Sequence, residues 1–97
     1  MGEQSIVEQR MQWIKAEDVP KVWIYEGFEH SHRLVTNKRQ GASLSFHITT
    51  YQPNFDTMVV GQGKDEVVLY CLEGDSRQIE DNGNEVHFTP GMAVYLP

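Results

Sequence analysis

The stretch Leu69–Pro97, LYCLEGDSRQIEDNGNEVHFTPGMAVYLP, decides the fold class of this chain. Short strand-like runs alternate in it with residues that favour tight turns. The sequence DNG at 81–83 separates SRQIE from NEVHF, and Asn-Gly between two such runs is a strong signal for a β-hairpin. The sequence PG at 90–91 fits the two central positions of a type II turn. This part of the chain is therefore predicted to form short antiparallel strands.

The same pattern extends upstream. Further strands are predicted at Val22–Glu26, His32–Thr36, Ser43–Tyr51 and Glu66–Glu73, with Phe55–Val60 as another candidate. The segment Ser43–Tyr51 alternates most regularly, with Leu44, Phe46 and Ile48 on one face and Ser43, Ser45, His47 and Thr49 on the other. The segment Glu66–Glu73 is almost continuously apolar, which predicts burial on both faces.

Many short strands separated by Gly and Pro turns favour an all-β antiparallel sandwich or barrel. The length of 97 residues suits a single domain over 1–97, with residues 1–20 as an N-terminal extension. Within this extension, Ser5–Ile14 has a helical pattern that begins with a capping box, whereas Met11–Lys15 fits a short strand equally well. The predicted helix and the alternative strand both end before Pro20, because proline disfavours a helical conformation of the residue in front of it.

Charge and composition exclude several classes of protein. The chain has 14 acidic and 8 basic residues, which disfavours a general nucleic-acid binder. The pair Lys38-Arg39 is interpreted as a solvated cluster in a turn over 37–41. No apolar run approaches the ~18 residues that a membrane helix needs, and no signal-peptide pattern is present. The single cysteine, Cys71, excludes an intrachain disulfide and is expected to be buried, so we expect a cytoplasmic protein without membrane partners.

Two motifs carry a family resemblance. The sequence YCLEG at 70–74, followed by the Asn-Gly hairpin and PGMAVYLP at 90–97, resembles the cupin family of small jelly-roll barrels. The sequence SHRLVTNKRQGASLSFHITTY at 31–51 is similar to the corresponding region of ectoine synthase, a cupin lyase that cyclises N-γ-acetyl-diaminobutyrate with loss of water. The resemblance extends over residues 11–97 and implies a cupin-type jelly-roll fold.

The resemblance also implies that the metal site of the family is lost. Cupins usually hold a divalent metal through histidines and one glutamate, ligands that suit a borderline metal. The family's glutamate position falls on Val67, and Glu66 is one residue away, which places it on the opposite face of a regular strand. The histidine positions fall in VVGQG at 59–63, and a later ligand position falls on Val94, beside Tyr95. We therefore expect neither metal nor cofactor, although a bulge before Glu66 would turn that carboxylate inward.

The substrate side of the ectoine synthase pattern is partly retained. Ser31 and Arg33 match a Ser and an Arg of the family, while Glu29 replaces a Trp. The polar positions of SFHITT contribute His47 and Thr49 to the same cavity. The resemblance thus implies a ligand site made of Ser31, Arg33, His47 and Thr49, in which an inward Arg33 would bind a carboxylate through two hydrogen bonds.

Two other interpretations of these residues stay open. The polar face of Ser43–Tyr51 also fits the solvent side of an antiparallel strand, and Arg33 also fits an ordinary surface arginine. The sequence HSH at 30–32 places two imidazoles on one strand face, so His30 and His32, with His47, form an alternative metal site.

The leading functional hypothesis is a metal-free, ectoine-synthase-like cupin that binds a small polar or anionic metabolite in its barrel. The second is a lyase or isomerase whose acid and base are His47 and Tyr95, and the third is a structural or interaction module. Relative to the family, the chain lacks the continuation of the second motif, which predicts an open sheet edge. A homodimer burying more than ~1,000 Å², with Trp13 or Trp23 at the contact, is therefore expected.

Overall fold

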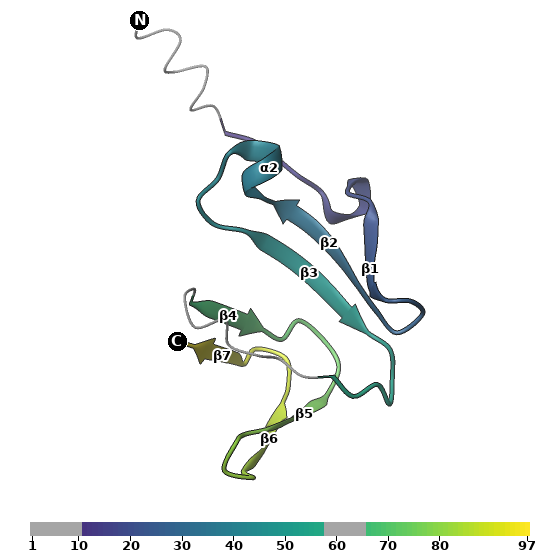
Figure 1. Ribbon diagram of the computed structural model, residues 1–97, viewed down its shortest axis with the longest axis vertical. Coiled ribbons are helices and arrows are strands. Elements are labelled where there is room, and N and C mark those ends of the chain that lie inside the picture. The colour runs from purple at the N-terminus through teal and green to yellow at the C-terminus, as the bar shows by residue number, and fades with distance from the viewer. Residues whose placement is uncertain (1–10, 58–65) are drawn as a thin grey trace, which may run out of the picture. The chain divides into compact units, whose positions relative to one another are not determined.

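The computed structural model describes residues 11–57 and 66–97 of the chain (Figure 1). Contacts between residues divide the chain into two compact units, Met1–Asp56 and Thr57–Pro97. Each unit is described by itself below. The prediction of a single domain over 1–97 stays a prediction.

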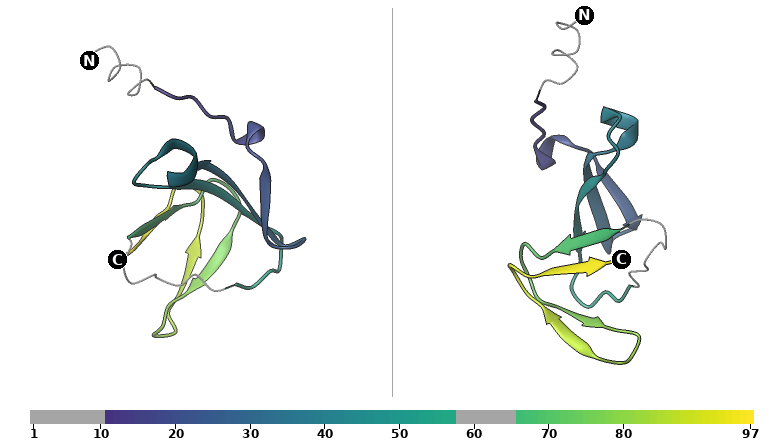
Figure 2. Two further views of the ribbon diagram at one scale, coloured as in Figure 1. Left: turned by 45° about the horizontal axis from the view of Figure 1, so that its top comes forward. Right: turned by 90° about the vertical axis from the view of Figure 1, so that its left-hand side faces the viewer.

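The first unit is built around a three-stranded antiparallel sheet. Its strands are β1 (Lys21–Tyr25), β2 (Glu29–Val35) and β3 (Phe46–Tyr51), in the order β1-β2-β3. A short 3₁₀ helix, η1 (Ala16–Asp18), precedes β1. Figure 2 shows the three strands side by side in two further views. The central strand β2 is thus paired on both edges, which makes it the best-supported strand of the unit.

A single helical turn, α2 (Asn37–Gln40), connects β2 to β3 where the sequence predicts a turn. The Thr36 side chain caps it by accepting a hydrogen bond from the Arg39 N–H at 3.0 Å. Gly41 ends it with a φ of 73°, a left-handed conformation that favours glycine. Lys38 and Arg39 are exposed, as expected, but they lie on a capped helix rather than in a loop.

The second unit consists of two antiparallel two-stranded ribbons. One pairs β4 (Val67–Tyr70) with β7 (Ala93–Leu96), and the other pairs β5 (Ser76–Ile79) with β6 (Glu85–Phe88). The DNG turn between β5 and β6 is confirmed. The type II turn at 90–91 is also confirmed, because Gly91 has a φ of 92° and the Met92 N–H donates to the Thr89 carbonyl at 3.1 Å.

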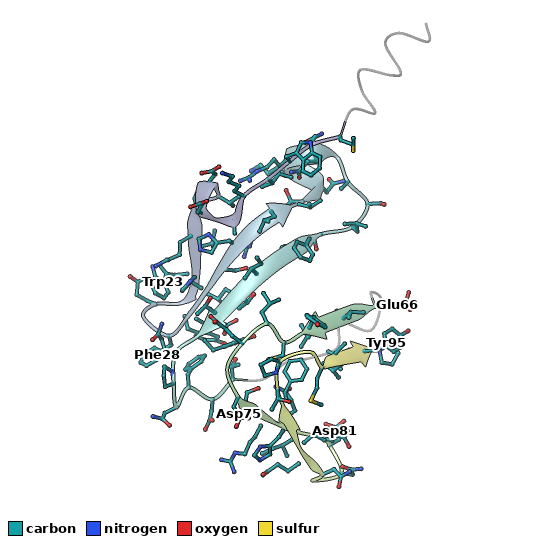
Figure 3. The ribbon with its side chains drawn as sticks, turned by 180° about the vertical axis from the view of Figure 1, so that it is seen from behind. Trp23, Phe28, Glu66, Asp75, Asp81 and Tyr95 are labelled. Carbon is teal, nitrogen blue, oxygen red and sulfur yellow. The ribbon has the colours of Figure 1, made fainter. Side chains whose placement is uncertain are left out.

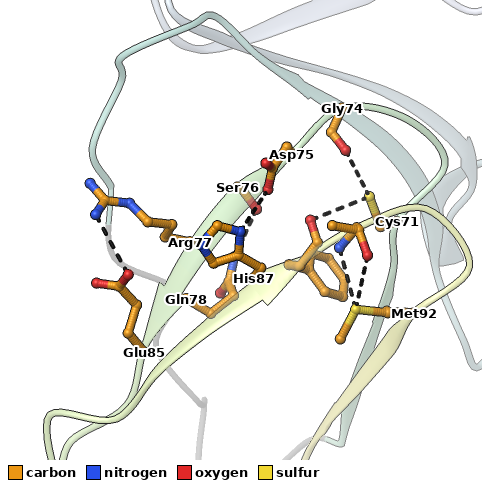
Figure 4. Close-up of polar contacts among 11 residues, drawn as sticks. Cys71, Gly74, Asp75, Ser76, Arg77, Gln78, Glu85, His87 and Met92 are labelled. Carbon is orange, nitrogen blue, oxygen red and sulfur yellow. Dashed lines mark hydrogen bonds and ion pairs between the residues drawn. The ribbon is translucent and has the colours of Figure 1, made fainter.

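The polar contacts in Figure 4 include two ion pairs made by residues of the β5–β6 ribbon and a group of contacts made by Cys71 and Met92. Arg77 forms an ion pair with Glu85 at 3.6 Å, and His87 Nδ1 lies 3.7 Å from an Asp75 carboxylate oxygen. Cys71 is buried as predicted, and its thiol points toward the Glu73 carbonyl at 3.6 Å. The exposed ion pairs contribute little to stability, because solvent screens them.

The apolar core of the described residues is small. Val19, Leu34 and Cys71 are its buried apolar members, and Glu29 and Ser31 are buried polar residues. Large apolar side chains elsewhere are exposed, among them Leu44, Phe46, Val68 and Tyr70. No helix in the described ranges is long and apolar enough to cross a membrane.

The predicted antiparallel β class is confirmed at the level of small antiparallel sheets. One short helix, α2, was not predicted, and the described residues form no closed barrel. Several strand limits were predicted wrongly. Strand β2 begins at Glu29 rather than His32, and β3 begins at Phe46 rather than Ser43. Met11–Lys15 has no regular structure, so the short strand proposed there is absent. Most of the alternative helix lies outside the described residues, as does the second half of Phe55–Val60, whose first half, 55–57, has no regular structure.

The predicted burial of Glu66–Glu73 on both faces is also wrong. Its strand is limited to Val67–Tyr70, and Val68 and Tyr70 are exposed while Val67 and Leu69 are half-buried. Burial therefore alternates along the ribbon, and only one of its two faces is partly covered.

Candidate functional site

The pairing of β2 with β3 places the four predicted ligand residues on one face of the sheet. Ser31 lies opposite Thr49, and Arg33 lies opposite His47. Alternate residues of a strand point to the same side, so these two cross-strand pairs share a face. The Thr49 hydroxyl donates to the Ser31 Oγ at 3.4 Å, which links the first pair directly. We call this side of the sheet the polar face.

Glu29 and Tyr51 extend the polar face at its other end, where they form the next cross-strand pair beyond Ser31. The Glu29 side chain is buried, with 7% of its surface exposed, and its Oε1 has no hydrogen-bond partner among the described residues. A buried carboxylate oxygen without a partner is unusual. In the sequence, Glu29 stands out only because it replaces a Trp of the family, and the predicted site does not include it. Its position two residues before Ser31 on the same strand is the signal that places both side chains on one face.

Burial and charge shift the acid–base properties of this face. Burial raises the pKa of Glu29. The pKa of Tyr51 is raised first by burial and then by the Glu29 charge. The pKa of His47 is lowered first by desolvation and then by the Arg33 guanidinium. The polar face therefore has a carboxyl group at one end and a permanent cation beside a histidine that resists protonation at the other.

The opposite face of the same sheet carries an aromatic row. The rings of Trp23 and His30 meet edge to face with centroids 5.2 Å apart, and His30 meets His32 in the same way at 5.6 Å. Lys21 Nζ lies 5.1 Å from the centre of the Trp23 ring, within range of a cation–π interaction. This row runs across β1 and β2.

The alternative metal site of three histidines is not brought together by this arrangement. His47 pairs with Arg33 and shares its face, whereas His30 and His32 alternate with Arg33 along β2. The ring of His32 is also engaged, because its Nδ1 donates to the Val19 carbonyl at 2.8 Å. In residues 11–57 and 66–97, no group of three or more metal-ligating side chains is found.

In the second unit, two of the expected metal-ligand positions, Val67 and Val94, lie on the half-buried face of the β4–β7 ribbon, whereas the expected histidine positions at 59–63 lie outside the described residues. Val94 lies opposite Leu69, and Val67 lies opposite Leu96. All four side chains are aliphatic and half-buried. These four side chains offer no atom that coordinates a divalent metal.

Glu66 and Tyr95 meet on the other face of that ribbon, where Figure 3 shows them at the ends of β4 and β7. The Tyr95 hydroxyl donates to Glu66 Oε1 at 2.5 Å, and this hydrogen bond is the main cause that raises the pKa of Tyr95. Both side chains are exposed. Tyr95 and His47, the acid–base pair of the second hypothesis, belong to different units, so the structure does not describe them as one site.

Comparisons of the chain with protein-family models, with curated proteins and with solved structures find no match.

Proposed function

We propose that the chain is a metal-free, cupin-like module that binds a small anionic metabolite on the polar face. The observation that carries the proposal is the register of β2 and β3, which aligns Ser31 with Thr49 and Arg33 with His47. A guanidinium binds a carboxylate through two parallel hydrogen bonds, and hydroxyl and imidazole groups beside it supply further donors and acceptors. In a closed jelly-roll barrel of the ectoine synthase type, this face would line the interior.

Two further observations support this proposal. An unpaired polar group costs about 1–3 kcal/mol when it is buried, and a bound ligand or water offsets that cost. Glu29 is such a group, because it is buried and its Oε1 has no hydrogen-bond partner among the described residues. The aliphatic side chains at Val67 and Val94 support the metal-free part, because the chemistry of a cupin metal site needs nitrogen and oxygen ligands there.

The test is a thermal-shift screen of small carboxylic acids and amino acids in buffer containing a chelator, followed by calorimetry on the hits. A ligand at 100 times its Kd adds about 2.7 kcal/mol to the unfolding free energy. Arg33→Met and His47→Gln are expected to weaken binding at least tenfold. Arg77→Met removes the same charge from the exposed β5 strand and should bind like the wild type.

The possible results separate the hypotheses. A melting temperature that falls on chelation, with one metal ion per chain in the untreated protein, would overturn the metal-free reading. A chain that binds none of the acids would instead favour the structural or interaction module. Binding that survives Arg33→Met and His47→Gln would place the ligand elsewhere than on the polar face.

A further inference from the structure

A hollow of about 600 Å³ lies on the first unit, beside the polar face. The start of β1 and the residues before it contribute Val19, Pro20 and Val22 to its wall. The end of β2 contributes Arg33, and helix α2 contributes Lys38 and Arg39. Thr36, which caps the helix, also lines the hollow. The volume is in the range typical of small-molecule sites.

The charge around this hollow is one-sided. Arg33, Lys38 and Arg39 line it, and no aspartate or glutamate of the described residues does. The chain as a whole is acidic, with a net charge of −6. Three cations that face the same space repel one another in the free protein, and an anion placed among them relieves this repulsion. The sign of the preferred ligand follows from this arrangement.

The two cations of α2 are held in place by the helix that carries them. The Gln40 side chain accepts a hydrogen bond from the Thr36 N–H at 2.9 Å and donates to the Leu34 carbonyl at 2.9 Å. These bonds fasten the only full turn of α2 to the end of the central strand. Lys38 and Arg39 are therefore attached to a fixed backbone, which lowers the entropy cost of binding.

The apolar side of the hollow is fixed in a similar way. Val19 is buried, and its carbonyl accepts the hydrogen bond from His32 Nδ1. Val19, Pro20 and Val22 present aliphatic surface to the same space as the cations. A ligand that is only an ion leaves this surface without a partner, whereas a short hydrocarbon chain would cover it.

We infer that this hollow binds a small organic oxyanion, whose phosphate or carboxylate head contacts Arg33, Lys38 and Arg39 and whose short apolar portion packs on Val19, Pro20 and Val22. The inference rests on the proposed function, because Arg33 belongs to both the polar face and the hollow. It adds the ligand class, an amphiphilic anion, and it adds Lys38 and Arg39 as residues that recognise it. Arg supplies a fork of donors for such a head group, and Lys supplies a point charge.

The probes are butyl phosphate, pentanoate, inorganic phosphate and butylammonium, titrated calorimetrically into the full chain at low salt. Butyl phosphate is expected to bind with a Kd on the order of 1 mM and about tenfold more tightly than inorganic phosphate, because the butyl chain buries apolar surface. Butylammonium should not bind. Comparison of butyl phosphate with pentanoate identifies which oxyanion the three cations prefer, and raised salt should weaken either one.

The double variant Lys38→Met, Arg39→Met tests the new residues, with Arg77→Met as the control for a lost surface charge. Both side chains are exposed, and neither substitution removes the hydrogen bonds that Gln40 makes, so circular dichroism should show an unchanged fold. A loss of tenfold or more in affinity for butyl phosphate supports the inference. Unchanged affinity in the double variant overturns it, as does a wild-type chain that binds neither oxyanion at about 10 mM, tenfold above the expected Kd.

His47→Gln separates the two proposals, because His47 does not line the hollow. If this substitution weakens the hits of the acid screen while the Lys38, Arg39 double variant leaves them unchanged, the polar face is the site and the hollow is not. If the double variant abolishes butyl phosphate binding and His47→Gln changes no ligand's affinity, the hollow is a site and the polar face as proposed is not.

Discussion

The Glu29 carboxylate is buried on the polar face, and its pKa is raised by that burial. A carboxyl group whose folded-state pKa lies above its unfolded value stabilises the fold at low pH, and this contribution is lost as the pH rises through the folded pKa. At neutral pH the contribution of Glu29 to stability is therefore smaller than at low pH. A carboxylate at such a position fits a group that meets a ligand, because perturbed pKa values concentrate at functional sites.

Glu29→Gln is expected to raise the unfolding free energy at pH 7 by about 1 kcal/mol, since the amide avoids the cost of burying a charge. Melting curves at pH 7 and pH 4 measure the effect, which should shrink at the lower pH where the wild-type carboxyl is protonated. Glu26→Gln, at an exposed neighbouring position, is the matched control. If Glu29→Gln instead made the chain less stable than the wild type at pH 7, the carboxylate would have a stabilising partner.

The contribution of His47 to stability depends on pH in the opposite direction. Its pKa is lowered by desolvation and by Arg33, so the unfolded chain binds its proton more readily than the folded chain does. Stability from this group is present above the unfolded pKa of about 6.5 and is lost as the pH falls below it.

Between pH 7.5 and pH 5.5, the melting temperature of the wild type should therefore fall more than that of His47→Gln. Titration of the His47 ring by nuclear magnetic resonance gives an independent measurement, and a midpoint above about 6.5 would contradict the expected direction.

At the scale of elements, α2 is too short to be stable by itself. Nucleation of a helix costs conformational entropy, and the hydrogen bonds of one helical turn do not offset that cost. The Gln40 side chain supplies the missing stabilisation through its two hydrogen bonds to Thr36 and Leu34. The net contribution of each hydrogen bond to the unfolding free energy is about 0.5–1.5 kcal/mol. The position of Lys38 and Arg39 at the hollow therefore depends on Gln40.

Gln40→Met is expected to lower the unfolding free energy by about 2 kcal/mol, since both hydrogen bonds are lost at similar side-chain volume. Gln40→Glu keeps the acceptor for the Thr36 N–H but cannot donate to the Leu34 carbonyl, and should fall between Met and the wild type. Urea unfolding measures both. Equal stability of all three proteins would mean that α2 is held by other contacts.

The sequence predicted those elements whose signals are local. The Asn-Gly hairpin and the Pro-Gly turn depend on the φ angles of one or two residues, and both form as expected. Helix α2 was missed, because a single turn has no periodicity and its support comes from Gln40, four residues from its cap. The beginning of β2 was missed because EHSHR has polar residues on both faces, which hides the alternation that marks a strand.

In the candidate site, too, the features that depend on local sequence were predicted and those that depend on tertiary packing were not. Strand alternation was enough to expect His47 and Thr49 on one face, and the family resemblance added Ser31 and Arg33. The β2–β3 register then brings the four together. The burial of Glu29 was not predictable from the sequence, because a charged residue is normally exposed and only tertiary packing decides otherwise. The hollow was not predictable either, since Lys38-Arg39 alone fits a solvated cluster.

At the scale of the whole molecule, a thin core accompanies extensive exposed apolar surface. Trp13 is 88% exposed, and Val68, Tyr70 and Leu72 are each exposed by 60% or more. The ribbons of the second unit have two strands each, and an isolated two-stranded ribbon is marginally stable in water. Among the described residues, both edges of the β4–β7 ribbon lack a further paired strand. Open edges and apolar faces of this kind are surfaces on which other chains pair.

A homodimer is accordingly predicted, because two-fold pairing is the commonest arrangement that covers such surfaces. The interface should bury more than ~1,000 Å² and include Trp13 or Trp23, of which Trp23 is 39% exposed. Sedimentation velocity at micromolar concentration measures the mass, and Trp13→Ser and Trp23→Ser, made separately, identify the contact. At least one of them should shift the dimer toward monomer, since a Trp at an interface centre contributes about 2 kcal/mol or more. A wild-type chain that sediments as a monomer would contradict the prediction, and a dimer unaffected by either substitution would move its interface away from both tryptophans.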